Sequence, residues 1–183
     1  MSKFILSFYG VFFILISILS FLNIIYSYYF NIYLNVNSYI PSLLISLVFG
    51  IFFILTKSKE VKISIFKKII TIFLGYLIFP LIISLPYYLS IYNISFINSL
   101  FEGISGFTST GFTIFENIKH LDQSLILWRS TSQWIGGLYF LFSIIILIDI
   151  FDDNLKRSLT NFISFNASEI TKQSFKIFSI YIF

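Results

Sequence analysis

The segment FEGISGFTSTGFTIFENI, residues 101–118, interrupts a chain that otherwise consists of long runs of Ile, Phe, Leu and Tyr. Its centre, from Thr108 to Thr113, reads Thr-Ser-Thr-Gly-Phe-Thr, so hydroxyl side chains and a glycine lie between two apolar stretches. Ser, Thr and Gly are also common in ordinary loops. The flanking residues therefore decide whether this stretch is a surface loop or a segment built into a membrane.

The composition of the chain predicts an integral membrane protein. Of its 183 residues, 57% are hydrophobic and 11% are charged, whereas about 25% of the residues of a soluble domain are charged. The chain has no Cys and one His, which excludes disulfides and thiolate sites and leaves little for a membrane enzyme. The net charge of +4 does not indicate a nucleic-acid partner, because the basic residues flank apolar runs.

Four stretches are long enough for a helix that crosses a bilayer, which needs about 20 apolar residues. The first resembles a signal peptide, but its apolar run is long and no small-residue cleavage site follows, so we predict a retained helix. Pro80 and Pro86 lie inside the third stretch, as membrane helices tolerate. The four predicted spans are residues 4–22, 39–56, 69–91 and 124–150.

The basic residues predict the orientation of these spans. If all four cross, ten of the twelve Lys and Arg residues fall on one side, and only Lys119 and Arg129 fall on the other. Basic residues accumulate on the cytoplasmic side of membrane proteins. We therefore expect a multi-pass protein of a bacterial cytoplasmic membrane, with a cytoplasmic N-terminus and residues 101–118 facing outward. The ten are Lys3, Lys57, Lys59, Lys62, Lys67, Lys68, Lys156, Arg157, Lys172 and Lys176.

The residues between the third and fourth spans have the outline of a re-entrant pore loop. Residues 96–106, FINSLFEGISG, make about three helical turns and are too short to cross a bilayer. The hydroxyl-rich stretch follows, and a polar exit runs from Glu116 to Gln123. Non-helical backbone at membrane depth survives where it is buried in protein or lines a water-filled cavity. The pattern therefore predicts a pore loop, although an ordinary outward loop remains the alternative.

The loop also predicts how an ion is bound. In a potassium filter, backbone carbonyls replace the water shell of the ion, and glycine permits the dihedral angles that this requires. The residues Ser109-Thr110-Gly111-Phe112 are similar to the Thr-Val-Gly-Tyr of such filters. We expect the ion-binding segment to comprise Thr108, Ser109, Thr110, Gly111 and Phe112, with K+ held by the backbone carbonyls of Ser109, Thr110 and Gly111.

The segments SLFEGISGFTSTGFT and LWRSTSQWIGGL resemble the first pore repeat of the TrkH/KtrB family of potassium transporter subunits. That family shows a pore helix of the type F-E-x-x-S-G-x-T-T-T-G, followed by W-R-x-x-x-Q-W-x-G-G at the start of the next helix. The match runs from Ser99 to Leu138 without a gap. Two residues depart from the pattern: Ser109 stands where Thr is common, and Phe112 stands where a small residue is frequent.

The resemblance implies an all-α integral membrane protein in which two leading helices, residues 1–60, precede a helix–pore loop–helix repeat, residues 61–153. Residues 154–183 then read as a cytoplasmic linker and the start of the next repeat. The family builds one pore from four such repeats, so we expect this chain to be a truncated, N-terminal portion. The resemblance also implies the partners: the remaining repeats, a homodimer of full-length subunits, a cytoplasmic nucleotide-binding regulatory subunit and the lipid bilayer. It implies no cofactor in this chain, with K+ or Na+ as the transported ion.

Two charged residues are expected to support the loop. Glu102 lies in the predicted pore helix and Arg129 in the first turns of the fourth span. Because a charge at membrane depth is expensive and usually paired, we expect a buried bridge between them behind the loop. In the alternative, Arg129 reaches the outer surface or pairs with Asp122 or Glu116.

Two glycines and two tryptophans follow at the start of the fourth span. Gly136 and Gly137 permit either close packing against the pore helix, which we favour, or a hinge. Trp128 and Trp134 are interpreted as interface anchors and packing residues.

Potassium transport across the cytoplasmic membrane, with one selectivity-filter loop of a four-repeat pore supplied by this chain, is the function that the sequence favours. One alternative is an unrelated polytopic secondary transporter whose loop only mimics a filter. Another is a non-conducting fragment of the potassium transporter. An enzyme is not expected, because clustered His, Cys or carboxylate residues at the membrane face are missing.

Overall fold

The computed structural model describes residues 3–56 and 64–148, and this part of the chain is helical with no strand. Four of its helices are long and apolar enough to cross a membrane, so the prediction of an all-helical integral membrane protein is confirmed. The expected linker at 154–183 and most of the basic residues lie outside the described residues. The helices are α1 (Lys3–Tyr29), α2 (Val36–Leu55), α3 (Ile65–Tyr88), α4 (Phe96–Phe107), the short 3-10 helix η1 (Ile118–His120) and α5 (Gln123–Ile148).

The predicted spans agree with these helices, except that α1 extends seven residues beyond the predicted end at Leu22. Polar residues follow directly after that predicted end. In the structure, the Asn23 amide donates to the carbonyl of Leu19 and the Ser27 hydroxyl donates to the carbonyl of Asn23. Both side chains are fully buried. Because each bonds to the preceding turn of its own helix, the polar residues do not end α1.

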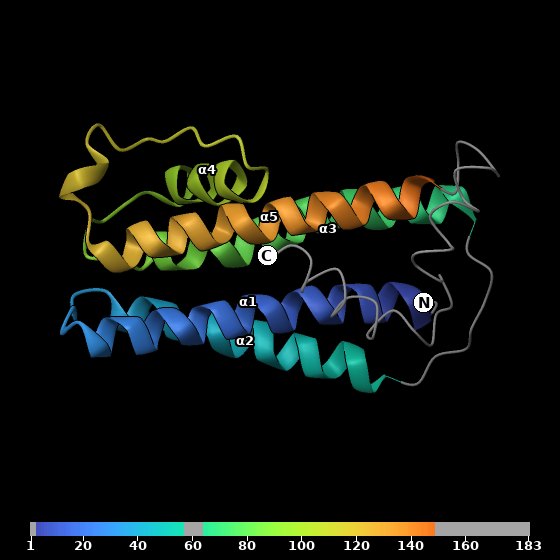
Figure 1. Cartoon of the computed structure of the whole chain (residues 1–183), viewed down its shortest axis with the longest axis horizontal. Coiled ribbons are helices and arrows are strands. Elements are labelled where there is room, and N and C mark those ends of the chain that lie inside the picture. The colour runs from blue at the N-terminus through green and yellow to red at the C-terminus, as the bar shows by residue number, and fades with distance from the viewer. Residues whose placement is uncertain (1–2, 57–63, 149–183) are drawn as a thin grey trace.

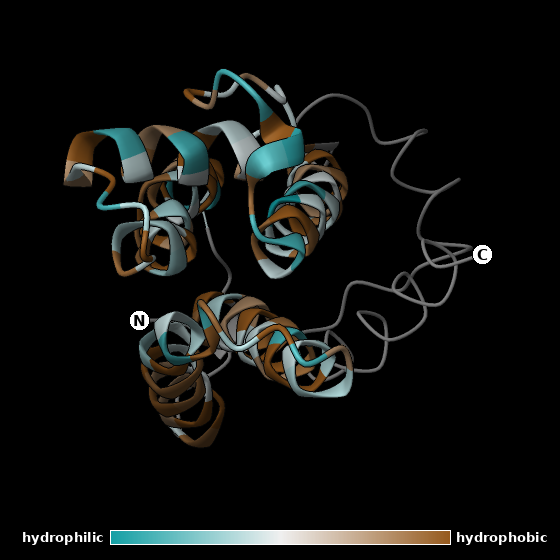
Figure 2. Cartoon of the chain, turned by 90° about the vertical axis from the view of Figure 1, so that its left-hand side faces the viewer, coloured by the Kyte–Doolittle hydropathy of each residue, from teal (hydrophilic) through white to brown (hydrophobic). Residues whose placement is uncertain are grey.

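The helices form two layers, with α1 and α2 in one and α3 and α5 in the other (Figures 1 and 2). The short helix α4 lies on the side of α3 and α5 that faces away from α1 and α2. It enters from the end where α3 stops, and it ends about halfway along α5. The chain then returns to the end from which α4 entered (Figure 1). Residues 96–118 therefore begin and end at the same end of the bundle (Figure 1).

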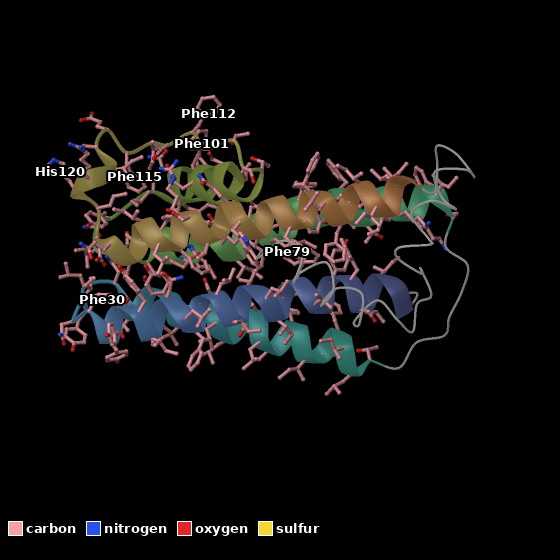
Figure 3. The ribbon with its side chains drawn as sticks, viewed as in Figure 1. Phe30, Phe79, Phe101, Phe112, Phe115 and His120 are labelled. Atoms are coloured by element: carbon pink, nitrogen blue, oxygen red, sulfur yellow. The ribbon has the colours of Figure 1, made fainter. Side chains whose placement is uncertain are left out.

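Aromatic side chains fill the space between the layers and reach the end of α4. Tyr139 of α5 lies at the centre, with its ring centroid 4.9 Å from that of Phe12 and 5.4 Å from that of Phe79. Phe107, the last residue of α4, packs 5.1 Å from Tyr139. Figure 3 shows Phe79 between the two layers. The end of α4 therefore packs into the aromatic core of the molecule.

The proline-containing helix α3 is tied to its neighbours through its carbonyl groups. Pro86 has no N–H, so the carbonyl of Ile82 loses its partner within the helix. The hydroxyl of Ser42 in α2 donates to that oxygen over 2.9 Å. The indole of Trp128 donates to the adjacent carbonyl of Ile83 over 3.0 Å. Trp128 is buried, so it is a packing residue and not an interface anchor.

Candidate functional site

Helix α4 turns its small and polar side toward the protein and its large apolar side outward. Glu102, Gly103 and Gly106 are buried, whereas Phe101 and Ile104 are exposed. A Cβ on Gly103 would lie 2.6 Å from the carbonyl oxygen of Pro80, and a Cβ on Gly106 would fall on the hydroxyl of Ser132. The absent side chains therefore allow α4 to lie directly against α3 and α5.

The segment after α4, which we call the 108–112 loop, turns its first N–H groups back toward that helix. Ser109 has a φ of 56° and Gly111 a φ of 77°, both in the left-handed region. The N–H of Ser109 donates to the carbonyl of Gly106 over 2.9 Å. The N–H groups of Thr110 and Gly111 both donate to the carbonyl of Ser105, over 3.1 and 3.4 Å. The first two bonds form the Schellman arrangement that caps many helices.

This arrangement leaves three consecutive carbonyl groups directed away from the helix. No peptide bond among the described residues is cis, and in a trans peptide the C=O points opposite to the N–H of the next residue. The carbonyls of Thr108, Ser109 and Thr110 therefore point away from the end of α4. All three residues are exposed, and no donor among residues 3–56 and 64–148 reaches these oxygens. The loop thus presents a short row of free carbonyl dipoles.

The hydroxyl groups of the same residues bond to the protein. Thr108 donates to the carbonyl of Ile104 over 2.8 Å, and Ser109 donates to the carbonyl of Gln133 in α5 over 3.0 Å. Thr110 donates to the carbonyl of Ser105 over 3.2 Å. The hydroxyl groups therefore fix the loop against α4 and α5, while the carbonyl oxygens of the same three residues stay free.

The carbonyl of Gly111 has a different environment from the one that the sequence predicts. The guanidinium of Arg129 donates through Nη2 to this oxygen over 2.7 Å and to that of Phe112 over 3.1 Å. The hydroxyl of Ser105 also donates to Phe112, over 2.6 Å. Of the three carbonyls expected to bind K+, those of Ser109 and Thr110 have no donor among the described residues, whereas that of Gly111 accepts from Arg129. The side chain of Phe112 is exposed and points away from the bundle (Figure 3).

Glu102 binds the next part of the chain from within α4. Its Oε1 accepts from the hydroxyl of Thr113 over 2.6 Å and from the N–H of Ile114 over 2.7 Å. Its Oε2 lies 3.7 Å from Nη1 of Arg129, with the two side chains 0% and 8% exposed. The predicted buried pair is therefore present. Asp122, the alternative partner of Arg129, instead accepts from Asn35 and Ser124.

Gly136 of α5 lies directly against the end of α4. A Cβ at this position would overlap the carbonyl of Phe107, the last residue before the 108–112 loop. Close packing, the favoured interpretation, therefore describes Gly136 better than a hinge does. Gly137 and Trp134 are partly buried.

Three further residues contribute to this arrangement without a role assigned from the sequence. Ser105 and Gln133 both fall within the family pattern, so the pattern could have indicated them, although it did not reveal that their backbone carbonyls hold the loop. Tyr87 of α3 is fully buried beside Glu102 and Arg129. It is one of twelve tyrosines, and nothing in the sequence distinguishes it from the others.

Part of the chain is similar in sequence to known transporters. The chain is 37% identical over 111 residues to an uncharacterized cation transporter of Methanocaldococcus jannaschii. It is 33% identical over 84 residues to the Trk system potassium uptake protein TrkG of Escherichia coli, and 44% identical over 55 residues to TrkI of Halomonas elongata. These matches cover 58%, 45% and 30% of this chain. No protein-family model matches the chain.

A solved structure has the same fold. The crystal structure of the potassium transporter TrkH from Vibrio parahaemolyticus superposes with a TM-score of 0.76 and 18% sequence identity, over 98% of this chain and 36% of TrkH. The matched segments cover 23%, 17% and 11% of the three relatives, so the chain spans well under two thirds of their lengths. The resemblance to the TrkH/KtrB family that the sequence predicts is thus confirmed, by homology over part of the chain and by fold over nearly all of it.

Proposed function

We propose that this chain supplies one of the four selectivity-filter loops of a potassium transporter. The observation that supports this most is the row of free carbonyls of Thr108, Ser109 and Thr110 on an exposed loop. Carbonyl oxygens on a filter replace the hydration shell of K+. The loop also follows the C-terminus of α4, where the helix dipole is negative and favours a cation. K+ is cargo here and not a resident cofactor.

One loop cannot surround an ion, so the proposal requires further loops. Residues 61–153 would form the first helix–pore loop–helix repeat and residues 1–60 the two leading helices. The remaining repeats of a full-length chain would complete the ring of carbonyls. The names of the relatives favour potassium as the ion. From the family resemblance we also propose a homodimer of full-length subunits, a cytoplasmic nucleotide-binding regulatory subunit and a location in the bacterial cytoplasmic membrane.

Potassium uptake in a bacterial strain that lacks its own uptake systems tests this function. A complete four-repeat protein that carries this repeat should restore growth at limiting K+ and accumulate K+ in preference to Na+. Ion uptake by the 183-residue chain expressed alone is measured in parallel. This comparison tests the alternative of a non-conducting fragment. Uptake of an organic solute without movement of either cation would favour the alternative of an unrelated secondary transporter and would overturn the proposal.

A further inference from the structure

The turn that joins α1 to α2 exposes four large aromatic side chains, which we call the aromatic turn. The exposed fractions are 59% for Tyr28, 76% for Tyr29, 53% for Phe30 and 56% for Tyr33. Residues 4–56 contain no charged side chain, so no charge keeps this surface in water. A large exposed apolar patch marks a site that binds another protein or a membrane. The aromatic turn therefore requires a partner.

The backbone at the end of α1 is suited to a place that holds little water. Asn31 has a φ of 57°, in the left-handed region. The N–H of Ile32 donates to the carbonyl of Ser27 over 2.8 Å, and that of Asn31 donates to the carbonyl of Tyr28 over 3.3 Å. These two bonds form the Schellman arrangement. Because lipid penalises unpaired backbone groups, this capped end of α1 can be covered by lipid at low cost.

The length of α1 places the aromatic turn at the boundary of the bilayer. Helix α1 has 27 residues, about 40 Å at 1.5 Å per residue, whereas the hydrocarbon core is about 30 Å thick. Its first residue, Lys3, belongs at the opposite boundary because of its charge. The last two turns of α1 therefore extend past the core. Figure 3 shows Phe30 just beyond them, at the same end of the bundle as His120.

We propose that the aromatic turn binds the phospholipid headgroup region of the outer leaflet and anchors the α1–α2 hairpin at a fixed depth. Tyrosine suits this position because its ring is apolar and its hydroxyl is polar. The Tyr33 hydroxyl donates to Oδ1 of Asn31 over 2.7 Å, and the rings of Tyr28 and Tyr33 lie 5.7 Å apart. The turn thus presents its side chains as one surface. Trp128, which the sequence suggested as an interface anchor, is buried.

The arrangement of the helices favours lipid over the rest of a full-length chain as the partner. The aromatic turn belongs to the layer of α1 and α2, and α4, which leads into the 108–112 loop, lies on the far side of α3 and α5 (Figures 1 and 2). The further repeats of the proposed pore must surround that loop, so they approach from the other side of the molecule. This one step rests on the proposed function, whereas the composition, capping and length of α1 do not.

Spin labels on single cysteines measure the depth of the aromatic turn. The complete protein with this repeat, without other cysteines, carries Tyr29→Cys and is reconstituted in vesicles of phosphatidylethanolamine and phosphatidylglycerol. Two control variants carry the label at other exposed positions, Val48→Cys in α2 and His120→Cys in η1. Collision rates are compared for oxygen, which concentrates in hydrocarbon, and for a nickel chelate, which stays in water.

We expect the label at position 29 to collide with the nickel chelate less than the label at 120 and more than the label at 48. Nickel access equal to that at 120 would place the turn in water, and access equal to that at 48 would place it in hydrocarbon. Shielding from both agents, or spin–spin coupling between two labels at 29, would mean that protein covers it. Each of these three results would overturn the proposal. Because K+ uptake is a separate readout, the anchor can fail while the proposed function stands.

Replacement of the rings tests whether they set this depth. With the label at Leu34→Cys, an exposed position beside the turn, the combined changes Tyr28→Ser, Tyr29→Ser and Tyr33→Ser should increase collisions with the nickel chelate. The matched combination of Tyr→Trp changes at the same three positions should leave the collision rate unchanged, because Trp also prefers the interface. Equal rates in the serine variant and its parent would show that the rings do not anchor the hairpin.

Discussion

At the scale of single residues, Glu102 and Arg129 matter through the backbone that they hold as much as through each other. A charged side chain at membrane depth is expensive and usually has a dedicated partner. Here Arg129 donates to the carbonyls of Gly111 and Phe112, and Glu102 accepts from Thr113 and Ile114. Arg129 therefore binds hydrogen-bond acceptors and Glu102 binds hydrogen-bond donors, in consecutive parts of one loop.

Exchanging the two charges should consequently fail to restore function, even though the residues are paired. In the double variant Glu102→Arg with Arg129→Glu, a carboxylate would face carbonyl oxygens and a guanidinium would face N–H groups. We expect uptake of K+ by a complete protein with this repeat to be lost in the double variant, as in both single variants. Glu102→Gln should retain more uptake, because its amide oxygen can still accept from Ile114. Wild-type uptake by the double variant would show that only the pairing matters.

Gly136→Ala should damage the loop from behind. The added methyl group would overlap the carbonyl of Phe107, which is backbone and cannot turn aside, so the end of α4 must move. Overpacking of this kind costs about 1–3 kcal/mol. We expect a lower Tm and weaker discrimination between K+ and Na+ in uptake. Gly50→Ala is the control for overpacking elsewhere, because its Cβ would meet the side chain of Ile14 at 2.7 Å and the backbone N of Ile14 at 3.1 Å, where α2 packs on α1. Equal discrimination in the two variants would contradict this account.

At the scale of elements, a buried polar cluster attaches the α1–α2 hairpin to the repeat. The amide of Asn35 donates to Oδ2 of Asp122 over 2.9 Å and accepts from the N–H of Ile91 over 3.0 Å. Ser124 donates to the same carboxylate, and Tyr39 donates to Ser124. Asn35 thus joins the segment before α2, the segment after α3 and the start of α5.

Asn35→Leu should therefore loosen the hairpin. The change leaves the part-buried N–H of Ile91 without this partner and removes a donor from the buried carboxylate of Asp122. An orphaned buried group costs about 1–3 kcal/mol. We expect a clear fall in Tm in detergent, whereas Asn37→Leu, at an exposed position two residues away, should change it little. Equal shifts for the two variants would show that the cluster does not support the hairpin.

The sequence predicted the elements well because hydrophobic length determines a membrane helix. It predicted four spans, and the short helix at 96–106 was placed within one residue of α4. It did not predict the length of α1, because buried Asn23 and Ser27 bond within their own helix. It also did not indicate which carbonyls of the loop accept hydrogen bonds from the protein. Their direction depends on N–H groups that turn back to Ser105 and on the reach of Arg129, and neither has a pattern in the sequence.

At the scale of the whole molecule, the fold sharpens the prediction of orientation. The starts of α1 and α3, which include Lys3, Lys67 and Lys68, lie at the end of the bundle opposite η1, which includes Lys119 (Figure 1). Arg129 is buried beside Glu102, so it does not count as a basic residue of the outer surface. The bias toward a cytoplasmic N-terminus is therefore stronger than the ten-to-two distribution suggests.

Labelling of introduced cysteines tests this orientation. The chain has no Cys, so none of its native residues reacts with a thiol reagent. One variant has a single cysteine in place of Ser64, and a second has one in place of His120 in η1. Ser64 is suitable because it is exposed and its side chain makes no capping bond to α3. In intact cells a membrane-impermeant thiol reagent should label the His120 position alone. The Ser64 position should react only after the cells are opened. Labelling of both positions in intact cells would contradict the topology and the re-entrant loop with it.

The central claim is that the 108–112 loop lines the ion path, and Gly111→Ser tests it most directly. With φ at 77°, a residue with a Cβ is strained there by about 1–2 kcal/mol, although the nearest side-chain atom, of Gln133, would be 3.7 Å away. The strain should therefore distort the neighbouring carbonyls while the protein still inserts. Thr110→Val is the control, because it removes a hydroxyl and keeps the carbonyl.

The measurement is uptake of K+ and Na+ by a complete protein with this repeat, in a strain without its own potassium uptake, at matched membrane abundance. We predict that Gly111→Ser admits Na+ and weakens the apparent affinity for K+, and that Thr110→Val changes both less. Unchanged K+ affinity and Na+ rejection in Gly111→Ser would mean that this loop does not line the ion path.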